Sequence, residues 1–174
     1  RPCTGSASIL LASEEIVKKY TNSPIWITGI GQKTTSAGFT KNVSLSSMES
    51  TKIAGKSALK MANHNISEID VAEVHDAFSV CEPMILESLG FTKPGEGMDM
   101  IKKLNETNNF MINPRGGLIG SGHPLGATGI SQTIEIVQQL QNTAENRQTD
   151  NPKTGLVHNM SAAATSSTVL VLEK

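Results

Sequence analysis

The chain has 174 residues, of which 37% are hydrophobic, 18% charged and 3% aromatic. This length suits one globular domain with its own core, which excludes a disulfide-stapled mini-protein and a coiled coil. The net charge of -1 indicates no general field that would attract nucleic acid or an anionic membrane. Apolar runs are too short to cross a bilayer. Two cysteines without a CxxC pair or a Cys/His cluster predict reduced thiols, a cytoplasmic location and no metal site.

The N-terminal part of the sequence predicts alternating strands and helices. Small aliphatic residues predict a buried strand over residues 6–12, followed by a short helix and a second strand over residues 25–30. A loop rich in Gly, Ser and Thr then leads to Ser46, which forms a capping-box pattern with Glu49. An amphipathic helix is expected to start there.

The C-terminal part continues this alternation. A strand is predicted at 71–75 and a helix at 78–89, whose apolar side chains occupy most of its circumference, so we expect burial on more than one side. The remaining predicted elements are a helix at 98–105, a brief strand at 111–113, a helix at 127–140 and two final strands at 155–160 and 167–172. The order predicts an α/β fold with a mixed sheet and helices on its faces.

The strongest local signal is a glycine-rich loop over residues 116–129, which reads GGLIGSGHPLGATG. Six glycines just before a helix let backbone amides converge on a ligand without interference from Cβ atoms. His123 at its centre can donate to a developing oxyanion or take a proton from a nucleophile. The loop can bind a phosphate or a thioester oxygen, with Ser121, Gly122 and Gly126 as candidate binding residues. The alternative is a structural turn in which backbone groups satisfy His123.

Two further polar segments follow predicted strands. His75 and Asp76, in the segment VHDAF, stand at a strand end, where open α/β sheets bind their ligands. The alternative is that Asp76 caps a helix and His75 is a hydrogen-bonded core residue. The segment VHNMS at 157–161 is a polar patch between two strands, and its alternative is a tight turn.

Together these segments resemble one family, the thiolases, in the branch of sterol carrier protein X and archaeal acetyl-CoA acetyltransferases. VHDAF is similar to the family's HDCF or NEAF element, GHPLGATG to its GHP element, and the HN of residues 158–159 to an HN near the C-terminus. The likeness runs from Gly5 to the end and corresponds to the C-terminal half of a subunit. It implies a thiolase-fold half over residues 1–174, with a mixed five-stranded sheet and helices on both faces.

The resemblance also implies a mechanism. In thiolases a nucleophilic cysteine of the N-terminal half accepts the acyl group, and a second cysteine moves the proton of the Claisen step. His123 matches the histidine that assists the thiolate and helps form an oxyanion hole, and His75 matches a residue that holds part of that hole. The implied activity is acyl transfer on short acyl-CoA thioesters, either acetoacetyl-CoA thiolysis or acetyl-CoA condensation. CoA thioester is then the substrate, without a permanent cofactor, in a homo-oligomer of complete subunits.

Some positions depart from the thiolase pattern. Ala77 and Met160 stand where the two branches carry the second cysteine, and residues 162–164 are alanines in place of glycines. Cys81, one helical turn beyond Ala77, is a candidate substitute base, with an inert apolar filler as the alternative. The alternative function is a non-catalytic module that binds a CoA thioester or a protein. We expect the chain without its N-terminal half to be inactive and to expose apolar surface or self-associate.

Overall fold

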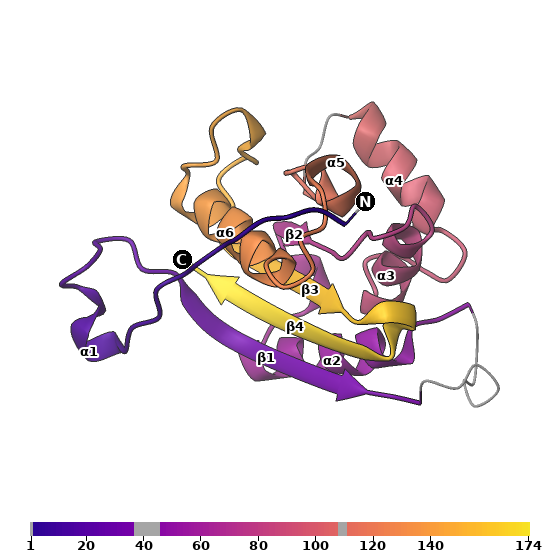
Figure 1. The fold of residues 1–174 in the computed structure, drawn as a ribbon, viewed down its shortest axis with the longest axis horizontal. Helices are drawn as coiled ribbons and strands as arrows, with labels where there is room; N and C mark the ends of the chain where they lie inside the picture. The colour runs from indigo at the N-terminus through magenta and orange to yellow at the C-terminus, as the bar shows by residue number, and fades with distance from the viewer. Residues whose placement is uncertain (1, 37–45, 108–110) are drawn as a thin grey trace.

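The computed structural model describes residues 2–36, 46–107 and 111–174, and it confirms the α/β class (Figure 1). One mixed sheet has the strand order β1-β4-β3-β2. Its strands are β1 (Trp26–Thr34), β2 (Val71–Glu73), β3 (Thr154–Met160) and β4 (Ser166–Glu173). β4 is antiparallel to both β1 and β3, whereas the short β2 is parallel to β3. Within the described ranges no helix is long and apolar enough to span a membrane.

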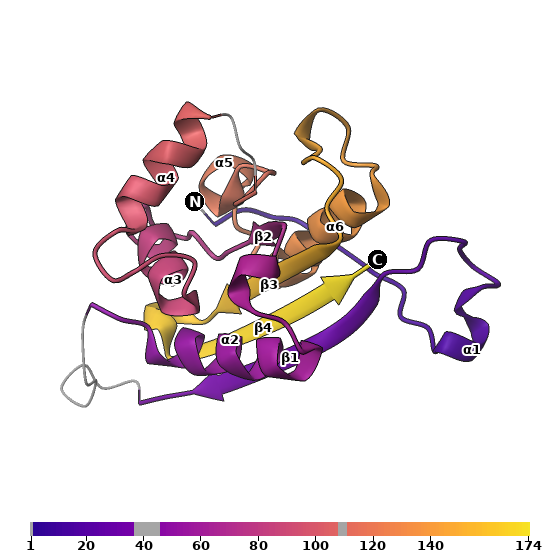
Figure 2. The ribbon, with the colours of Figure 1, turned by 180° about the vertical axis from the view of Figure 1, so that it is seen from behind.

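Helices cover both faces of the sheet, as expected. They are α1 (Glu14–Val17), α2 (Glu49–Ala62), α3 (Cys81–Leu89), α4 (Gly97–Glu106), α5 (Gly117–Ser121) and α6 (Thr128–Gln141). Short 3-10 turns occur at Ile66–Glu68 (η2), Glu145–Arg147 (η3) and Ala162–Ala164 (η4). The two views show α6 on one face and α2 on the other (Figures 1 and 2).

Each face has its own hydrophobic cluster. One lies between the sheet and the helices α2 and α3, and it includes Ala54, Ala58 and Ile85. The close approach of α2 requires glycine on β1, because a Cβ at Gly29 or Gly31 would collide with backbone carbonyls of α2. The other cluster lies under α6 and consists of Val71, Ile136, Leu140, Val157 and Leu172.

The predicted strand at 6–12 is wrong. This segment crosses the molecule as extended chain outside the sheet (Figure 1). Leu10 and Leu11 are 76% and 70% exposed, because no sheet edge lies beside them in the described structure. The predicted strand at 111–113 is also reduced, to an isolated bridge between Ala72 and Ile112. The sheet in the described ranges therefore has four strands rather than five.

Several predicted element ends shift. α2 begins at Glu49 with Met48 at the N-cap and no side-chain cap, so the capping box at Ser46 is wrong. β1 extends to Thr34 into the predicted loop. α3 begins only at Cys81, which leaves Phe78 72% exposed. The expectation of burial around most of that helix holds for the segment inside α3 and fails for the residues before it.

Candidate active site

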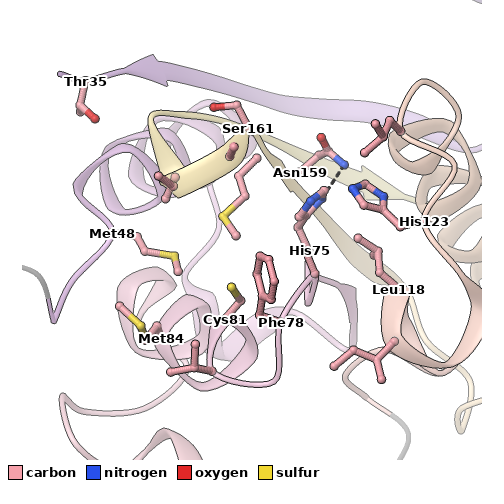
Figure 3. Close-up of a pocket in the computed structure, with 18 of the residues that line it drawn as sticks. Thr35, Met48, His75, Phe78, Cys81, Met84, Leu118, His123, Asn159 and Ser161 are labelled. Carbon is pink, nitrogen blue, oxygen red and sulfur yellow. Dashed lines mark hydrogen bonds between the residues drawn. The ribbon is translucent and has the colours of Figure 1, made fainter. Parts of the chain in front are cut away.

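His75 and His123 meet beside a cavity of about 1370 Å³ (Figure 3). His75 follows the end of β2 and is 6% exposed, and His123 follows α5. Their rings pack edge to face with the centroids 4.9 Å apart. Most of the other lining is apolar and includes Met48, Phe78, Cys81, Met84, Leu118 and Met160. The structure thus brings the two candidate catalytic histidines together at a large, mainly apolar cavity.

Asp76 connects the two histidine-bearing segments. Its buried carboxylate accepts hydrogen bonds from the backbone N–H of Leu118 at 2.6 Å and of Ile119 at 3.5 Å, in the first turn of α5. Gly117 lies against this carboxylate with φ of 62°, and a Cβ there would collide with it. Asp76 therefore caps α5 rather than the helix that follows it in sequence, and it fixes the glycine-rich loop to the end of β2.

The side chain of Thr128 orients His123. The Thr128 hydroxyl donates to the carbonyl of Pro124 at 2.9 Å and lies 2.7 Å from Nδ1 of His123. When the single hydroxyl hydrogen is directed to Pro124, the Thr128 oxygen accepts from His123 Nδ1–H. Burial lowers the pKa of His123. The neutral ring then presents a bare Nε2, the form that accepts a proton from a thiol.

Asn159 orients His75. The Asn159 side-chain nitrogen lies 3.0 Å from Nδ1 of His75 (Figure 3). The same nitrogen donates to the Gln132 side-chain oxygen, also at 3.0 Å. An amide NH2 group can only donate, so His75 Nδ1 accepts and Nε2 carries the ring hydrogen. Burial, with a smaller contribution from nearby His123, lowers the pKa of His75 to about 4. A neutral His75 that donates from Nε2 suits an oxyanion site.

The side chain of His158 points to the other face of the sheet. His158 is fully buried, and its Nε2 lies 3.0 Å from the Thr51 hydroxyl. A hydrogen-bonded chain continues from Thr51 through Ser167 and Ser50 to the carbonyl of Ala164. Burial lowers the pKa of His158 to about 3, so this histidine is neutral. The two residues of the HN dipeptide therefore contact different groups, Asn159 the ring of His75 and His158 the hydroxyl of Thr51. Because β3 continues through Met160, the alternative of a tight turn at 157–161 is wrong.

Glu73 is a buried carboxyl two residues before His75. Desolvation raises its pKa to about 8, and Arg115 offsets only part of this effect because the two side chains are 4.0 Å apart. Its Oε2 has no hydrogen-bond partner among the described residues. At pH 7 Glu73 is therefore mostly protonated, and it adds little negative charge to the end of β2.

The candidate binding residues of the glycine loop lie apart from the cavity lining. The Ser121 hydroxyl is exposed and donates to the carbonyl of Arg115 at 2.7 Å. Gly122 has φ of 87° and lies next to Cys3, and Gly126 has open space around its Cα. These three residues stay candidates for contact with the CoA part of a substrate.

The positions that depart from the thiolase pattern lie at the cavity itself. Ala77, Met160 and Cys81 all line it. Cys81 is 7% exposed, and burial raises the pKa of its thiol, which keeps the proton on sulfur. Ala163 and Ala164 line the cavity with φ of 56° and 52°, in the left-handed region. No group of metal-ligating side chains occurs in the part of the chain that the structure describes.

Sequence reasoning missed two of the orienting residues, Gln132 and Thr128. Thr128 lies inside the glycine-rich motif, but only the fold shows that its hydroxyl contacts His123. Gln132 carries no local signal, since a single glutamine in an amphipathic helix is typical of its solvated face. Its complete burial is visible only once α6 packs on β3.

Comparisons with known proteins define the family. Residues 31–174 match the model of the thiolase C-terminal domain-like family, and the chain belongs to this family. It is 32% identical to an acetyl-CoA acetyltransferase of Methanothermobacter thermautotrophicus, covering 98% of this chain and 45% of that protein. It is 35% identical to sterol carrier protein 2 of Gallus gallus, covering 90% of this chain and 30% of that protein. The chain thus spans less than half the length of these curated relatives.

Solved structures share the fold. A structure described as an Ltp2-ChsH2(DUF35) aldolase superposes with a TM-score of 0.80 at 21% identity, covering 92% of this chain and 42% of that one. The Bacillus anthracis acetyl-CoA acetyltransferase superposes with a TM-score of 0.65 at 16% identity, covering 94% of this chain and 34% of that one. These two comparisons confirm a thiolase-like fold.

Proposed function

We propose that the chain is the C-terminal half of a thiolase-type acyltransferase for short acyl-CoA thioesters. The observation that carries this proposal is the pairing of two histidines whose rings pack 4.9 Å apart at one cavity, each held at Nδ1 by its own polar partner, Thr128 or Asn159. The family membership and the relatives named acetyl-CoA acetyltransferase support the same activity. A homo-oligomer of complete subunits and a cytoplasmic location belong to this proposal.

The roles follow from the hydrogen placement. His123 takes a proton through Nε2 from the nucleophilic thiol, which the N-terminal half supplies. His75 donates from Nε2–H to the oxyanion that develops on the thioester carbonyl. The surrounding apolar side chains exclude water and so strengthen both interactions. Ser121, Gly122 and Gly126 are the proposed contacts to CoA, which is a substrate here and not a permanent cofactor.

The test is CoA-dependent cleavage of acetoacetyl-CoA by the full-length protein and by its His123→Ala and His75→Ala variants. Removal of one oxyanion donor costs about 100- to 1000-fold in kcat, so we expect at least this loss for each variant. A wild-type protein that cleaves acetoacetyl-CoA, with a His123→Ala variant of equal rate, would contradict the assignment.

A second candidate function is a non-catalytic thiolase-like module that binds a CoA thioester or a protein. The replacement of the second cysteine by Ala77 and Met160, both at the cavity, favours it. The residue at the nucleophile position of the N-terminal half separates the two functions. A cysteine there supports acyl transfer, whereas its absence together with retained CoA binding supports the module.

A further inference from the structure

We propose that Gln132 is a positioning residue that, through Asn159, holds the hydrogen of the His75 ring on Nε2. The chain of contacts runs from the His158 carbonyl to Gln132, then to Asn159 and finally to His75. The role assigned to His75 rests on the proposed function, whereas the hydrogen placement on its ring does not.

The direction of the chain is set at its backbone end. The carbonyl of His158 can only accept, and the Gln132 side-chain nitrogen lies 3.4 Å from it. The Gln132 side-chain oxygen therefore faces the nitrogen of Asn159, 3.0 Å away. That nitrogen has two hydrogens, of which the second points to Nδ1 of His75 at 3.0 Å. Each contact in the series thus has one donor and one acceptor.

The reversed arrangement leaves an acceptor facing an acceptor. If both amides were turned over, the Asn159 oxygen would accept from His75 Nδ1–H, and the Gln132 nitrogen would donate to Asn159. The Gln132 oxygen would then face the carbonyl of His158, and Gln132 is fully buried, so no bulk water could separate the two oxygens. A main-chain carbonyl cannot turn over, and it therefore determines the hydrogen placement on His75.

The same helix orients the other histidine. Thr128 and Gln132 stand four residues apart in α6, so their side chains share one face of the helix. Thr128 accepts from Nδ1 of His123, and Gln132 acts on His75 through Asn159. One face of α6 thereby gives the two rings opposite forms, with a bare Nε2 on His123 and a donor Nε2–H on His75.

The test reads the hydrogen placement directly. Ring nitrogens with and without hydrogen have distinct 15N shifts, so the full-length protein is labelled with ring-15N histidine and measured by magic-angle-spinning spectroscopy. His75→Gln and His123→Gln variants assign the signals. For the wild-type protein we expect His75 to carry its hydrogen on Nε2 and His123 to carry it on Nδ1. A wild-type His75 with hydrogen on Nδ1 would overturn the proposal.

Variants then test Gln132 itself. Gln132→Met keeps the side-chain length and removes both polar atoms, so we expect the His75 signals to move toward a mixture of the two forms. Gln132→Glu with its buried carboxyl protonated donates its O–H to the His158 carbonyl and keeps an acceptor that faces Asn159, so this variant should retain the wild-type signals. The control is Gln139→Met, the same change at another fully buried glutamine of α6, which should leave the His75 signals unchanged. Unchanged His75 signals in a folded Gln132→Met variant would refute the proposal.

The Asn159→Asp variant tests the hydrogen placement on His75 independently of the Gln132 variants, because it should reverse that placement. A carboxylate accepts from Nδ1–H, so His75 should move its hydrogen from Nε2 to Nδ1, with a loss of about 100-fold in acetoacetyl-CoA cleavage. Failure of the two proposals can be distinguished. The expected spectra without wild-type cleavage would refute only the proposed function. Cleavage by a wild-type protein whose His75 carries hydrogen on Nδ1 would refute the positioning role of Gln132 and the donor role of His75, but not the thiolase-type activity.

Discussion

The ring of His75 meets the ring of His123 edge to face, with 4.9 Å between the ring centroids. Two imidazolium ions at this separation would repel each other, and burial already disfavours a charge on either ring. The pair is therefore neutral before the reaction begins, and the acid limit of its working pH range follows from the pKa of His123, the ring that must accept a proton.

We expect acetoacetyl-CoA cleavage to persist at mildly acidic pH. Protonation of His123 removes its acceptor Nε2, but burial lowers the pKa of this ring below the usual 6.5. The acid limb of kcat/KM should therefore have its midpoint below pH 6.5. The measurement is a pH profile of kcat/KM, and an acid midpoint above pH 6.5 that is lost in the residual activity of the His123→Ala variant would contradict the prediction.

The free energy of unfolding should be greatest near pH 6.5. The folded chain keeps His75 and His158 neutral, with pKa values of about 4 and about 3, so stability falls as pH drops below the unfolded value of 6.5. Glu73 has the opposite effect, because its pKa of about 8 means that the folded chain keeps a proton that the unfolded chain loses above 4.5. Stability from this group is lost as pH rises toward 8.

Urea denaturation between pH 5 and pH 8.5 measures both limbs. In the matched variant Glu73→Gln, the decline between pH 6.5 and pH 8 should become smaller while the acid limb remains. An alkaline decline of equal slope in this variant would show that Glu73 does not cause it.

Glycine in place of either left-handed alanine at the cavity should stabilise the protein. Ala163 and Ala164 have φ of 56° and 52°, a conformation that costs an L-residue roughly 1–2 kcal/mol. We expect Ala163→Gly and Ala164→Gly each to raise the free energy of unfolding by up to about 1 kcal/mol, because the more flexible unfolded chain offsets part of the gain. Ala162→Gly is the control, since Ala162 has no positive φ, and it should be neutral or destabilising. Thermal unfolding of the three variants decides the matter.

Gly117 should tolerate no side chain. A Cβ there collides with the carboxylate of Asp76, and φ of 62° disfavours alanine as well. We expect Gly117→Ala to destabilise the protein by about 1–3 kcal/mol and to displace His123 from His75. Gly120→Ala is the matched control within α5, because a Cβ added at Gly120 would meet no atom within 4 Å. Equal losses in the two variants would show that the contact with Asp76 does not matter.

The isolated 174-residue chain should bind a hydrophobic dye or self-associate. Phe78 and Leu125 line the cavity and are each 72% exposed, and Ile119 is 60% exposed. Contiguous exposed apolar groups of this kind mark a surface that another chain covers. Light scattering combined with dye fluorescence measures both effects. A monomer that binds no dye would contradict the proposed contact with an N-terminal half.

Hydrophobic periodicity in the sequence predicted the C-terminal helix and the last two strands correctly. The helix predicted at 127–140 occurs at Thr128–Gln141. The ends of the last two strands lie within one residue of the predicted ends. The strand at 6–12 failed because aliphatic composition cannot reveal whether a partner strand exists. His75 and His123 could be named from their motifs, whereas the partners that set their ring forms depend on how α6 lies on β3. That packing has no local signature.

The candidate site depends on the register of β3 against β4, because His158 and Asn159 are consecutive residues of β3. Side chains alternate along β3, so Asn159 faces the cavity while His158 faces the polar network that ends at the carbonyl of Ala164. A slip of β3 by one residue against β4 would send each side chain to the opposite face. Both the histidine pair and the loop that lines the cavity would then lose their supports at once, so an insertion or deletion of one residue within β3 is expected to abolish the site while the sheet still forms.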